Sequence, residues 1–280
     1  MIFKKTNKES VVKKVKYIDK NNEVFSKIQK INHELEKENI MISEENRNDF
    51  LLSNLIVDSI DKNSNLGIQV QKATTHFRGD DDRDKVIQYP DLSLFLNKYA
   101  PYLKAGDFKT LGYLFHLYTD CKFFNQLFRN SFTFLDKDYK QTIYASEVVF
   151  AKLHKNGNVI SSKDFWAHNT DTSIYDDYTT INKIVIEYFG DGFNYEALKS
   201  DGGGFVDIPI TEVNPQNIFD VLDQTRAFIA ESYTTNNDLK VFKIEDILNF
   251  IPSVVTEFSK DFSDILKNYK NSKTLTKEKN

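Results

Sequence analysis

The stretch Leu111–Phe124 reads Leu-Gly-Tyr-Leu-Phe-His-Leu-Tyr-Thr-Asp-Cys-Lys-Phe-Phe, and most of its side chains are apolar or aromatic. The apolar run continues through Leu127 and Phe128 and contains no proline. It is too long and unbroken for a buried strand and therefore predicts a core helix. His116 and Asp120 stand one helical turn apart in this stretch, so we expect them to share one face of the helix.

A polar pair on an apolar helix has two interpretations. A carboxylate removed from water costs on the order of several kcal/mol unless it is paired or bound to a cation. His116 and Asp120 either satisfy each other with a hydrogen bond inside the core, or they are two ligands of a metal site. The second interpretation requires further ligands from other parts of the chain.

The composition of the 280 residues favours an all-α fold. Hydrophobic residues make up 40% of the chain and aromatic residues 14%, which is ample for a sizeable core, whereas only 10 Gly and 5 Pro are available for tight turns. We therefore predict one multi-helix domain around a central metal-binding helix. Its expected bounds are 23–270, after a basic N-terminal extension, 1–22, and before a polar tail, 271–280. The net charge of −4 gives no clear nucleic-acid signal.

The chain contains a single cysteine, Cys121. This excludes an internal disulfide framework and any zinc site built from several cysteines, and its place in the aromatic helix predicts an inert buried thiol. There is no run of about 18 apolar residues, so we expect no transmembrane segment. No apolar stretch follows the lysine-rich N-terminus, so we expect no secretory signal and a cytoplasmic location.

Apolar periodicity predicts further elements along the chain. Asp91 is well placed as the N-cap of one helix, and Pro252 is either tolerated in the last helix or kinks it. The acidic cluster Asp80–Asp84 lacks the spacing of an EF-hand and is expected to form a solvated loop. Residues 144–153 read as a short helix or strand and residues 156–173 as a loop. The helices are expected over 24–38, 48–58, 92–99, 174–188, 215–233 and 244–269.

Three segments together resemble the bacterial zinc-dependent phospholipase C family. Residues 50–59 resemble its Phe-Leu-Leu-Gly-Asn-Ile-Ala-Pro-Asp-Ser segment, with Ser53 and Val57 in place of the Gly and Pro. Residues 72–77 resemble its Lys-x-x-Thr-His-Phe segment, and residues 112–120 its Gly-Tyr-x-x-His-Leu-x-Thr-Asp helix. The segments occur in the family's order with similar gaps and fall within 31–128, under half of the chain.

This resemblance implies an all-α fold whose helices direct His and Asp side chains toward a central zinc cluster. It implies that Asp58, His76, His116 and Asp120 are metal ligands. His33 stands where the family has a histidine on its first helix, although the periodicity of 24–38 taken alone makes it an ordinary exposed histidine. The family's later His and Glu ligands have no match in residues 122–126.

Imidazoles and carboxylates without thiolates suit Zn²⁺, in one to three copies, or another divalent metal. The implied chemistry is a metal-activated hydroxide attacking a phosphoester, with Asp58 and Arg78 as catalytic residues. Arg78 is suited to hold a phosphoryl oxygen, or else pairs with the acids of Asp80–Asp84. No Ser-His-Asp or Cys-His pattern offers another nucleophile.

The sequence therefore predicts a metal-dependent phosphoester hydrolase of the zinc-dependent phospholipase C type. A phospholipid, a nucleotide or another small phosphodiester would each suit as its substrate. The alternative is a non-catalytic helical protein that keeps a degenerate metal site for stability or partner binding. The sequence predicts no oligomeric state.

Overall fold

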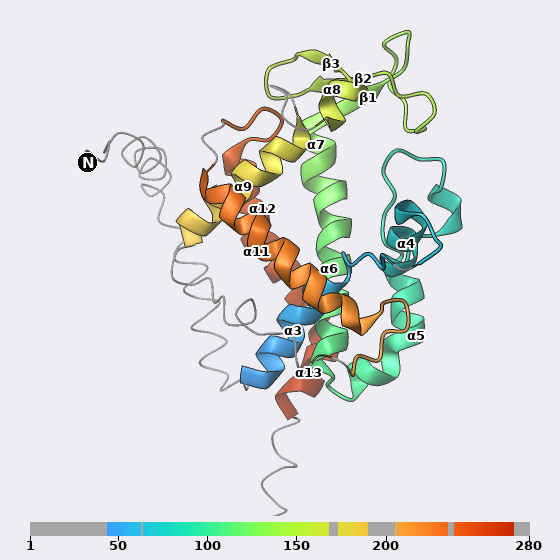
Figure 1. Cartoon of the computed structure of the whole chain (residues 1–280), viewed down its shortest axis with the longest axis vertical. Coiled ribbons are helices and arrows are strands. Elements are labelled where there is room, and N and C mark those ends of the chain that lie inside the picture. Colours follow the sequence, from blue (N-terminus) through green and yellow to red (C-terminus); the bar gives the residue numbers. More distant parts are fainter. Residues whose placement is uncertain are drawn as a thin grey trace, which may run out of the picture.

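The computed structural model describes residues 44–62, 64–167, 173–189, 205, 207–234 and 238–271 of the chain. This part is mostly helical, as expected, and also contains a small three-stranded sheet that the all-α expectation omits (Figure 1). The N-terminal extension, the helix predicted over 24–38 with His33, and residues 272–280 of the tail lie outside the described residues.

The helices follow one another along the chain with short 3₁₀ turns at Asp80–Asp82 (η2) and Pro215–Asn217 (η5). The helices predicted near 48–58, 92–99, 174–188 and 215–233 are confirmed with somewhat different ends. The described helices are α3 (Glu44–Ile56), α4 (Ile68–Thr75), α5 (Leu92–Lys104), α6 (Phe108–Lys122), α7 (Arg129–Ser131), α8 (Ser162–Trp166), α9 (Ile174–Phe189), α11 (Ile218–Thr234), α12 (Ile244–Asp261) and α13 (Ser263–Asn271).

Helix α6 is the central element, as the apolar run predicts. Asp107 caps its start by accepting a hydrogen bond from the backbone amide of Thr110 at 2.6 Å. Its middle buries Tyr113, Leu114 and Leu117 completely. The helix continues through a π-helical segment, Phe123–Phe128 (η3), into α7, so one continuous rod runs through the molecule toward the sheet (Figure 1).

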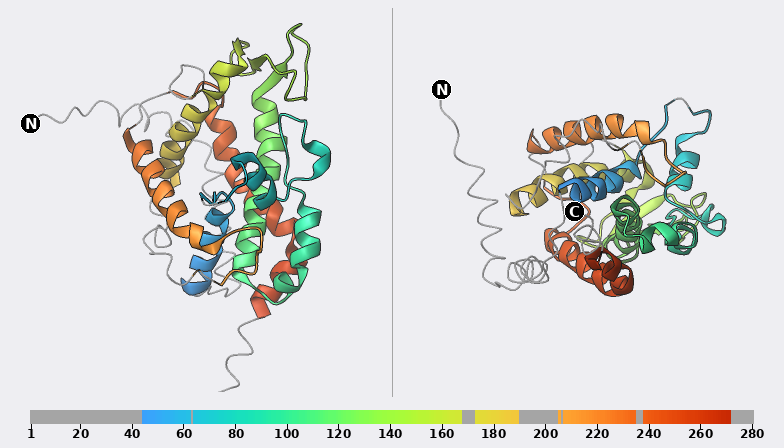
Figure 2. Two further views of the ribbon diagram at one scale, coloured as in Figure 1. Left: turned by 45° about the vertical axis from the view of Figure 1, so that its right-hand side comes forward. Right: turned by 90° about the horizontal axis from the view of Figure 1, so that it is seen from below.

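Helix α3 packs directly on α6 at a glycine. A Cβ atom added to Gly112 would lie 2.1 Å from the carbonyl oxygen of Phe50, so only glycine allows the two backbones to come this close. The side chain of Asn54 donates a hydrogen bond of 3.4 Å to the carbonyl oxygen of Gly112. Figure 2 shows α9 and α3 lying between α6 and the outer helix α11.

Helix α5 starts at the predicted cap. An oxygen of Asp91 accepts hydrogen bonds from the backbone amides of Ser93 and Leu94 at 2.9 and 3.4 Å. The helix packs on α6 through aromatic rings, with Phe95 stacked on Tyr113 at 5.5 Å between ring centroids. The turn between α5 and α6 contains Gly106 at φ 79°, a backbone conformation that favours glycine.

The sheet is antiparallel in the order β1 (Phe132–Leu135), β2 (Phe150–Leu153) and β3 (Val159–Ser161). Phe132 and Phe134 stand two residues apart in β1 and therefore point to the same face of the sheet, where both rings contact the ring of Phe165 in α8. These strands are too short to give a clear alternating pattern in the sequence. The loop predicted over 156–173 is therefore wrong where it contains β3 and α8.

The C-terminal region forms two helices rather than one. Pro252 is tolerated inside α12, which ends at Asp261, and Phe262, with a φ of −112°, separates α12 from α13. The hydrophobic-core residues Val254 and Phe258 of α12 pack against the same cluster as the centre of α6. The C-terminal helices thus cover the central helix from the side opposite α3 and α11 (Figure 2).

The loop before α12 depends on one buried carboxylate. The side chain of Asp177 on α9 accepts hydrogen bonds from the backbone amides of Lys240, Val241 and Phe242 at 2.6, 2.8 and 2.9 Å. We expect Asp177→Asn to lower the free energy of unfolding by about 2 kcal/mol, because an amide offers one acceptor oxygen and no charge. Urea unfolding measures this loss, and a variant as stable as wild type would contradict this role of Asp177.

Candidate metal centre

Four of the five predicted ligands come together in the structure. Asp58 follows the C-terminal end of α3, where its backbone amide still bonds to the carbonyl of Leu55 at 3.2 Å. His76 directly follows α4, and His116 and Asp120 lie on α6. The fifth predicted ligand, His33, lies outside the described residues. Three chain segments therefore converge on one face of the central helix.

The ligand atoms form a compact group. One oxygen or nitrogen atom each of Asp58, His76 and His116 lies within 4.8 Å of the other two. The Nε2 atoms of His76 and His116 are 3.6 and 3.7 Å from the same oxygen of Asp120. The same two nitrogens are 3.5 and 3.8 Å from the two carboxylate oxygens of Asp58. The predicted His116–Asp120 pair thus belongs to a larger cluster rather than to an isolated hydrogen bond.

Helix geometry determines which nitrogen of His76 faces this group. The Nδ1 atom lies 3.0 Å from the carbonyl oxygen of Lys72, one turn earlier in the chain. A carbonyl oxygen only accepts, so Nδ1 carries the proton in this contact, and in the neutral form of the ring the Nε2 lone pair faces Asp58 and Asp120. A backbone acceptor behind a ligating imidazole is the usual arrangement in metal sites.

His116 supplies a second nitrogen without a hydrogen-bond partner. Its Nε2 atom is buried and makes no hydrogen bond to any described residue. The Nε2 atoms of two imidazoles and the oxygens of two carboxylates therefore face one another. Such acceptors repel unless a proton or a cation lies between them, and the arrangement therefore fits a cation.

The spacing also fits a zinc ion. Bonds of about 2.0–2.2 Å to nitrogen and oxygen place the corners of a tetrahedral site about 3.3–3.6 Å apart. The four measured separations run from 3.5 to 3.8 Å, at most a few tenths longer. The donor set of two imidazoles and two carboxylates is one that Zn²⁺ accepts. Asp58, His76 and His116 form the mutually close group, and Asp120 adjoins it through its contacts with the two imidazoles.

Electrostatics keeps Asp58 ionised. Burial by its neighbours acts to raise the pKa of Asp58. When the imidazoles are protonated, the hydrogen bond from His76 and the positive charges of His116 and His76, together with Lys72, outweigh this effect and hold the pKa of Asp58 well below its usual range. The side chains of Asp58 and Asp120 are 55% and 27% exposed, against 3% for His76. Solvent and small molecules therefore reach the cluster from the carboxylate side.

Arg78 lies beside the two carboxylates. Burial lowers the pKa of its guanidinium, and the negative charges of Asp120 and Asp58 act against that shift. Its Nε atom is buried without a hydrogen-bond partner among the described residues. In the described part of the acidic loop, the ion pairs join Arg83 to Asp80 and Lys85 to Asp82. The alternative role of Arg78, as a partner of these acids, is thus not observed.

Two further residues, Lys72 and Tyr113, contribute to the site although the sequence did not identify them as site residues. Lys72 orients His76 through its carbonyl, and its ammonium group lies 3.5 Å from Asp58. The fully buried Tyr113 donates a hydrogen bond of 2.6 Å to the carbonyl of Thr75, directly before His76. The four-residue spacing from Lys72 to His76 was a readable signal, whereas the contact of Tyr113 depends on how α4 packs on α6.

Cys121 takes no part in the cluster. Its thiol donates a weak hydrogen bond to the carbonyl oxygen of Pro90, with a sulfur–oxygen distance of 3.1 Å. Burial, followed by the charges of Asp120 and Asp91, raises the pKa of this thiol to about 12. The thiol therefore stays protonated at neutral pH, as the prediction of an inert cysteine requires.

The fold and this cluster define a mostly helical protein with a candidate metal centre on its central helix. No family model matches the chain, and comparisons with curated proteins and with solved structures gave no significant match. Among the described helices, none is long and apolar enough to cross a membrane.

Proposed function

We propose that this chain is a metal-dependent phosphoester hydrolase, with zinc as the preferred metal, resembling the bacterial zinc-dependent phospholipase C family. One observation carries the proposal: the side chains of Asp58, His76, His116 and Asp120, all common metal ligands, converge with nitrogen–oxygen separations of 3.5 to 3.8 Å. This grouping is supported by the order and spacing of the three sequence segments that supply the four residues.

The four residues have distinct tasks in this proposal. His76 and His116 hold the ion from the buried side, and Asp58 and Asp120 hold it from the solvent side. A divalent ion bound there supplies Lewis acidity, which lowers the pKa of a coordinated water and polarises a phosphoryl oxygen. The exposed edge formed by the two carboxylates leaves room for water and substrate to approach.

The charges around the cluster favour an anionic substrate. A divalent ion balances the two carboxylates of Asp58 and Asp120, and the neutral imidazoles add no charge. Lys72 and Arg78 then leave the site with an excess positive charge. The planar guanidinium of Arg78 is suited to hold two phosphoryl oxygens at once, and Lys72 is suited to hold one. A phosphoester fits this charge better than an amide or a neutral ester.

A phosphodiester assay tests the proposal. We expect zinc-loaded protein to hydrolyse bis(nitrophenyl) phosphate, with phospholipids and nucleotides assayed beside it to find the better substrate. Asp58→Asn should reduce turnover to the background of metal in buffer while the helical circular dichroism stays unchanged. Arg78→Ala should lower kcat/KM about 10- to 100-fold without loss of zinc, because one charge-assisted contact to phosphate disappears.

Arg83→Ala is the matched control, because Arg83 is an exposed arginine paired with Asp80. It should leave turnover unchanged. Equal activity in Asp58→Asn and wild type would mean that the hydrolysis comes from a contaminant or another site. Failure of zinc-loaded protein to hydrolyse any of these phosphoesters would contradict the proposal.

A second function is favoured by the number of ligands. Four protein ligands in a tetrahedral shell leave no open position, which is the arrangement of structural zinc sites. The alternative is therefore a non-catalytic helical protein whose metal stabilises the packing of α3, α4 and α6. Zinc binding and metal-dependent thermal stability without any turnover would support this alternative.

A further inference from the structure

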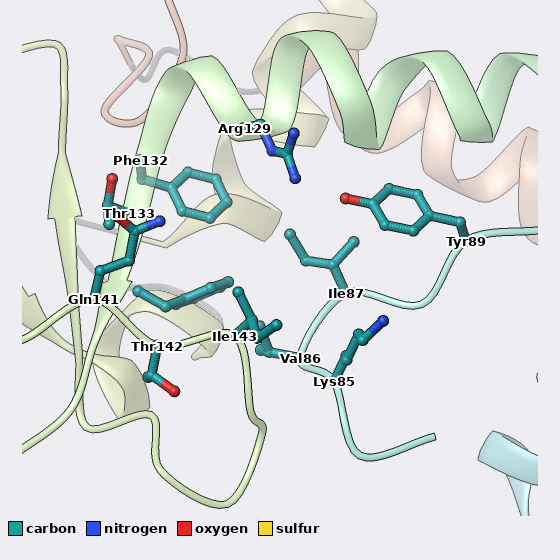
Figure 3. A pocket seen from close by; sticks show the side chains of 11 residues that line it. Lys85, Val86, Ile87, Tyr89, Arg129, Phe132, Thr133, Gln141, Thr142 and Ile143 are labelled. Atoms are coloured by element: carbon teal, nitrogen blue, oxygen red, sulfur yellow. The ribbon is translucent and has the colours of Figure 1, made fainter. Parts of the chain in front are cut away.

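A pocket of about 200 Å³ lies between the sheet and the segment that follows the acidic loop (Figure 3). Its floor is apolar and contains the buried rings of Phe132 and Phe134 from β1. Val86 and Ile87 form the facing wall. Apolar walls around a small number of polar groups are characteristic of ligand pockets.

Three polar side chains at the pocket are left without protein partners. Within the described part of the chain, the guanidinium of Arg129 forms no ion pair, and neither the hydroxyl of Tyr89 nor the amide of Gln141 forms a hydrogen bond through its side chain. Lys85 also lines the pocket but is paired with Asp82. Arg129 is therefore the cation available to a ligand.

The positions of these groups suggest how a ligand would lie. In Figure 3, the hydroxyl of Tyr89 points toward the side of the pocket where Arg129 lies, with Ile87 beneath them. Gln141 lies beyond Phe132, toward the opposite end. The positive charge is thus at one end of an apolar cavity, and an anionic group carried on an apolar body would match both features.

The pocket is distinct from the metal centre. Arg129 follows Asp120 by nine residues on the rod formed by α6, η3 and α7. At the helical rise of 1.5 Å per residue this corresponds to about 13 Å. None of the residues that line the pocket belongs to the metal cluster.

We propose that this pocket binds an amphiphilic organic anion, with a carboxylate or phosphate at Arg129 and Tyr89 and an apolar body on Phe132, Phe134 and Ile87. Guanidinium binds both kinds of anion with two parallel hydrogen bonds. The apolar body would displace water from the partly exposed side chains of Val86 and Ile87, which favours binding in proportion to the area covered. The proposal does not depend on catalysis at the metal centre.

Calorimetric titration of the full-length protein with octanoate and with octyl phosphate tests this inference. We expect at least one of them to bind, and whichever binds more tightly identifies the preferred anion. Arg129→Gln should weaken binding about tenfold or more, because a charge-assisted contact is lost. Tyr89→Phe should weaken it by a smaller factor. Octanol and inorganic phosphate, each with half of the required features, should bind more weakly than the amphiphilic anions.

Arg83→Gln is the matched control for loss of an exposed arginine and should leave binding unchanged. His116→Ala separates this pocket from the metal centre, because an anion held by the metal would lose its affinity in that variant and an anion held by Arg129 would keep it. Absence of binding by both anions, equal affinity in Arg129→Gln and wild type, or loss of binding in His116→Ala would each overturn the inference.

Discussion

His116→Ala is expected to lose its metal almost completely. The imidazole of His116 places a buried, unpartnered Nε2 atom 3.7 Å from Asp120 and 3.8 Å from Asp58, and no neighbouring side chain replaces it. Changes to groups that only orient a ligand already lower metal affinity about 10- to 100-fold, so removal of the ligand should cost at least about a hundredfold. Competition with a chromophoric zinc chelator measures this change.

His154→Ala is the matched control for this substitution. His154 is exposed and bonds to the carbonyl of Asn130 and the hydroxyl of Thr133, near the sheet. The control should bind zinc as wild type does. Zinc should also raise the melting temperature of wild type and of the control but not that of His116→Ala, because a ligand stabilises only a fold that binds it. Equal zinc affinity in His116→Ala and wild type would show that His116 is not a ligand.

Gly112→Ala is expected to be strongly destabilising. An alanine in an ordinary helix would stabilise it by about 1 kcal/mol relative to glycine. At Gly112, however, the new methyl group would overlap the backbone of Phe50, and backbone atoms cannot rotate away as a side chain does. We expect a net loss of at least about 3 kcal/mol in the free energy of unfolding, measured by urea denaturation.

Gly67→Ala and Gly79→Ala provide matched controls, because a Cβ atom at either position has nothing within 4 Å and their φ angles are −63° and −69°. Both should stay within about 0.5 kcal/mol of wild type. Gly112→Ala should also weaken zinc binding, because Asp58 follows the end of α3 and would move with α3 away from α6. A Gly112→Ala protein as stable as these controls would contradict the close packing of the two helices.

Local signals predicted much of this architecture. The apolar run around His116 predicted the central helix, and the position of Asp91 predicted a cap that the structure confirms. The sheet was missed because strands of three or four residues contain too few alternations to separate them from loops. The break between α12 and α13 was also missed, and a single helix was predicted over 244–269, because Phe262 at the break carries no helix-breaking signal in the sequence.

The candidate site was less predictable from the sequence than the helices were. The i, i+4 spacing of His116 and Asp120 follows from helix geometry alone, but their proximity to Asp58 and His76 was expected only from the resemblance to a family. The roles of Tyr113 and Lys72 depend on how α4 lies against α6, and Arg78 could not be assigned to the cluster or to the acidic loop without coordinates. The residues that join His116 and Asp120 in the site are therefore determined by how distant segments of the chain pack together.

X-ray absorption spectroscopy at the zinc edge tests the central claim most directly. The account predicts that protein loaded with one equivalent of zinc shows nitrogen and oxygen neighbours at about 2.0–2.2 Å and the scattering pattern of two imidazole rings. In His116→Ala the residual bound zinc should show at most one imidazole. A sulfur neighbour at about 2.3 Å, or wild-type zinc without two imidazoles, would contradict the assignment of His76, His116, Asp58 and Asp120 as the metal site.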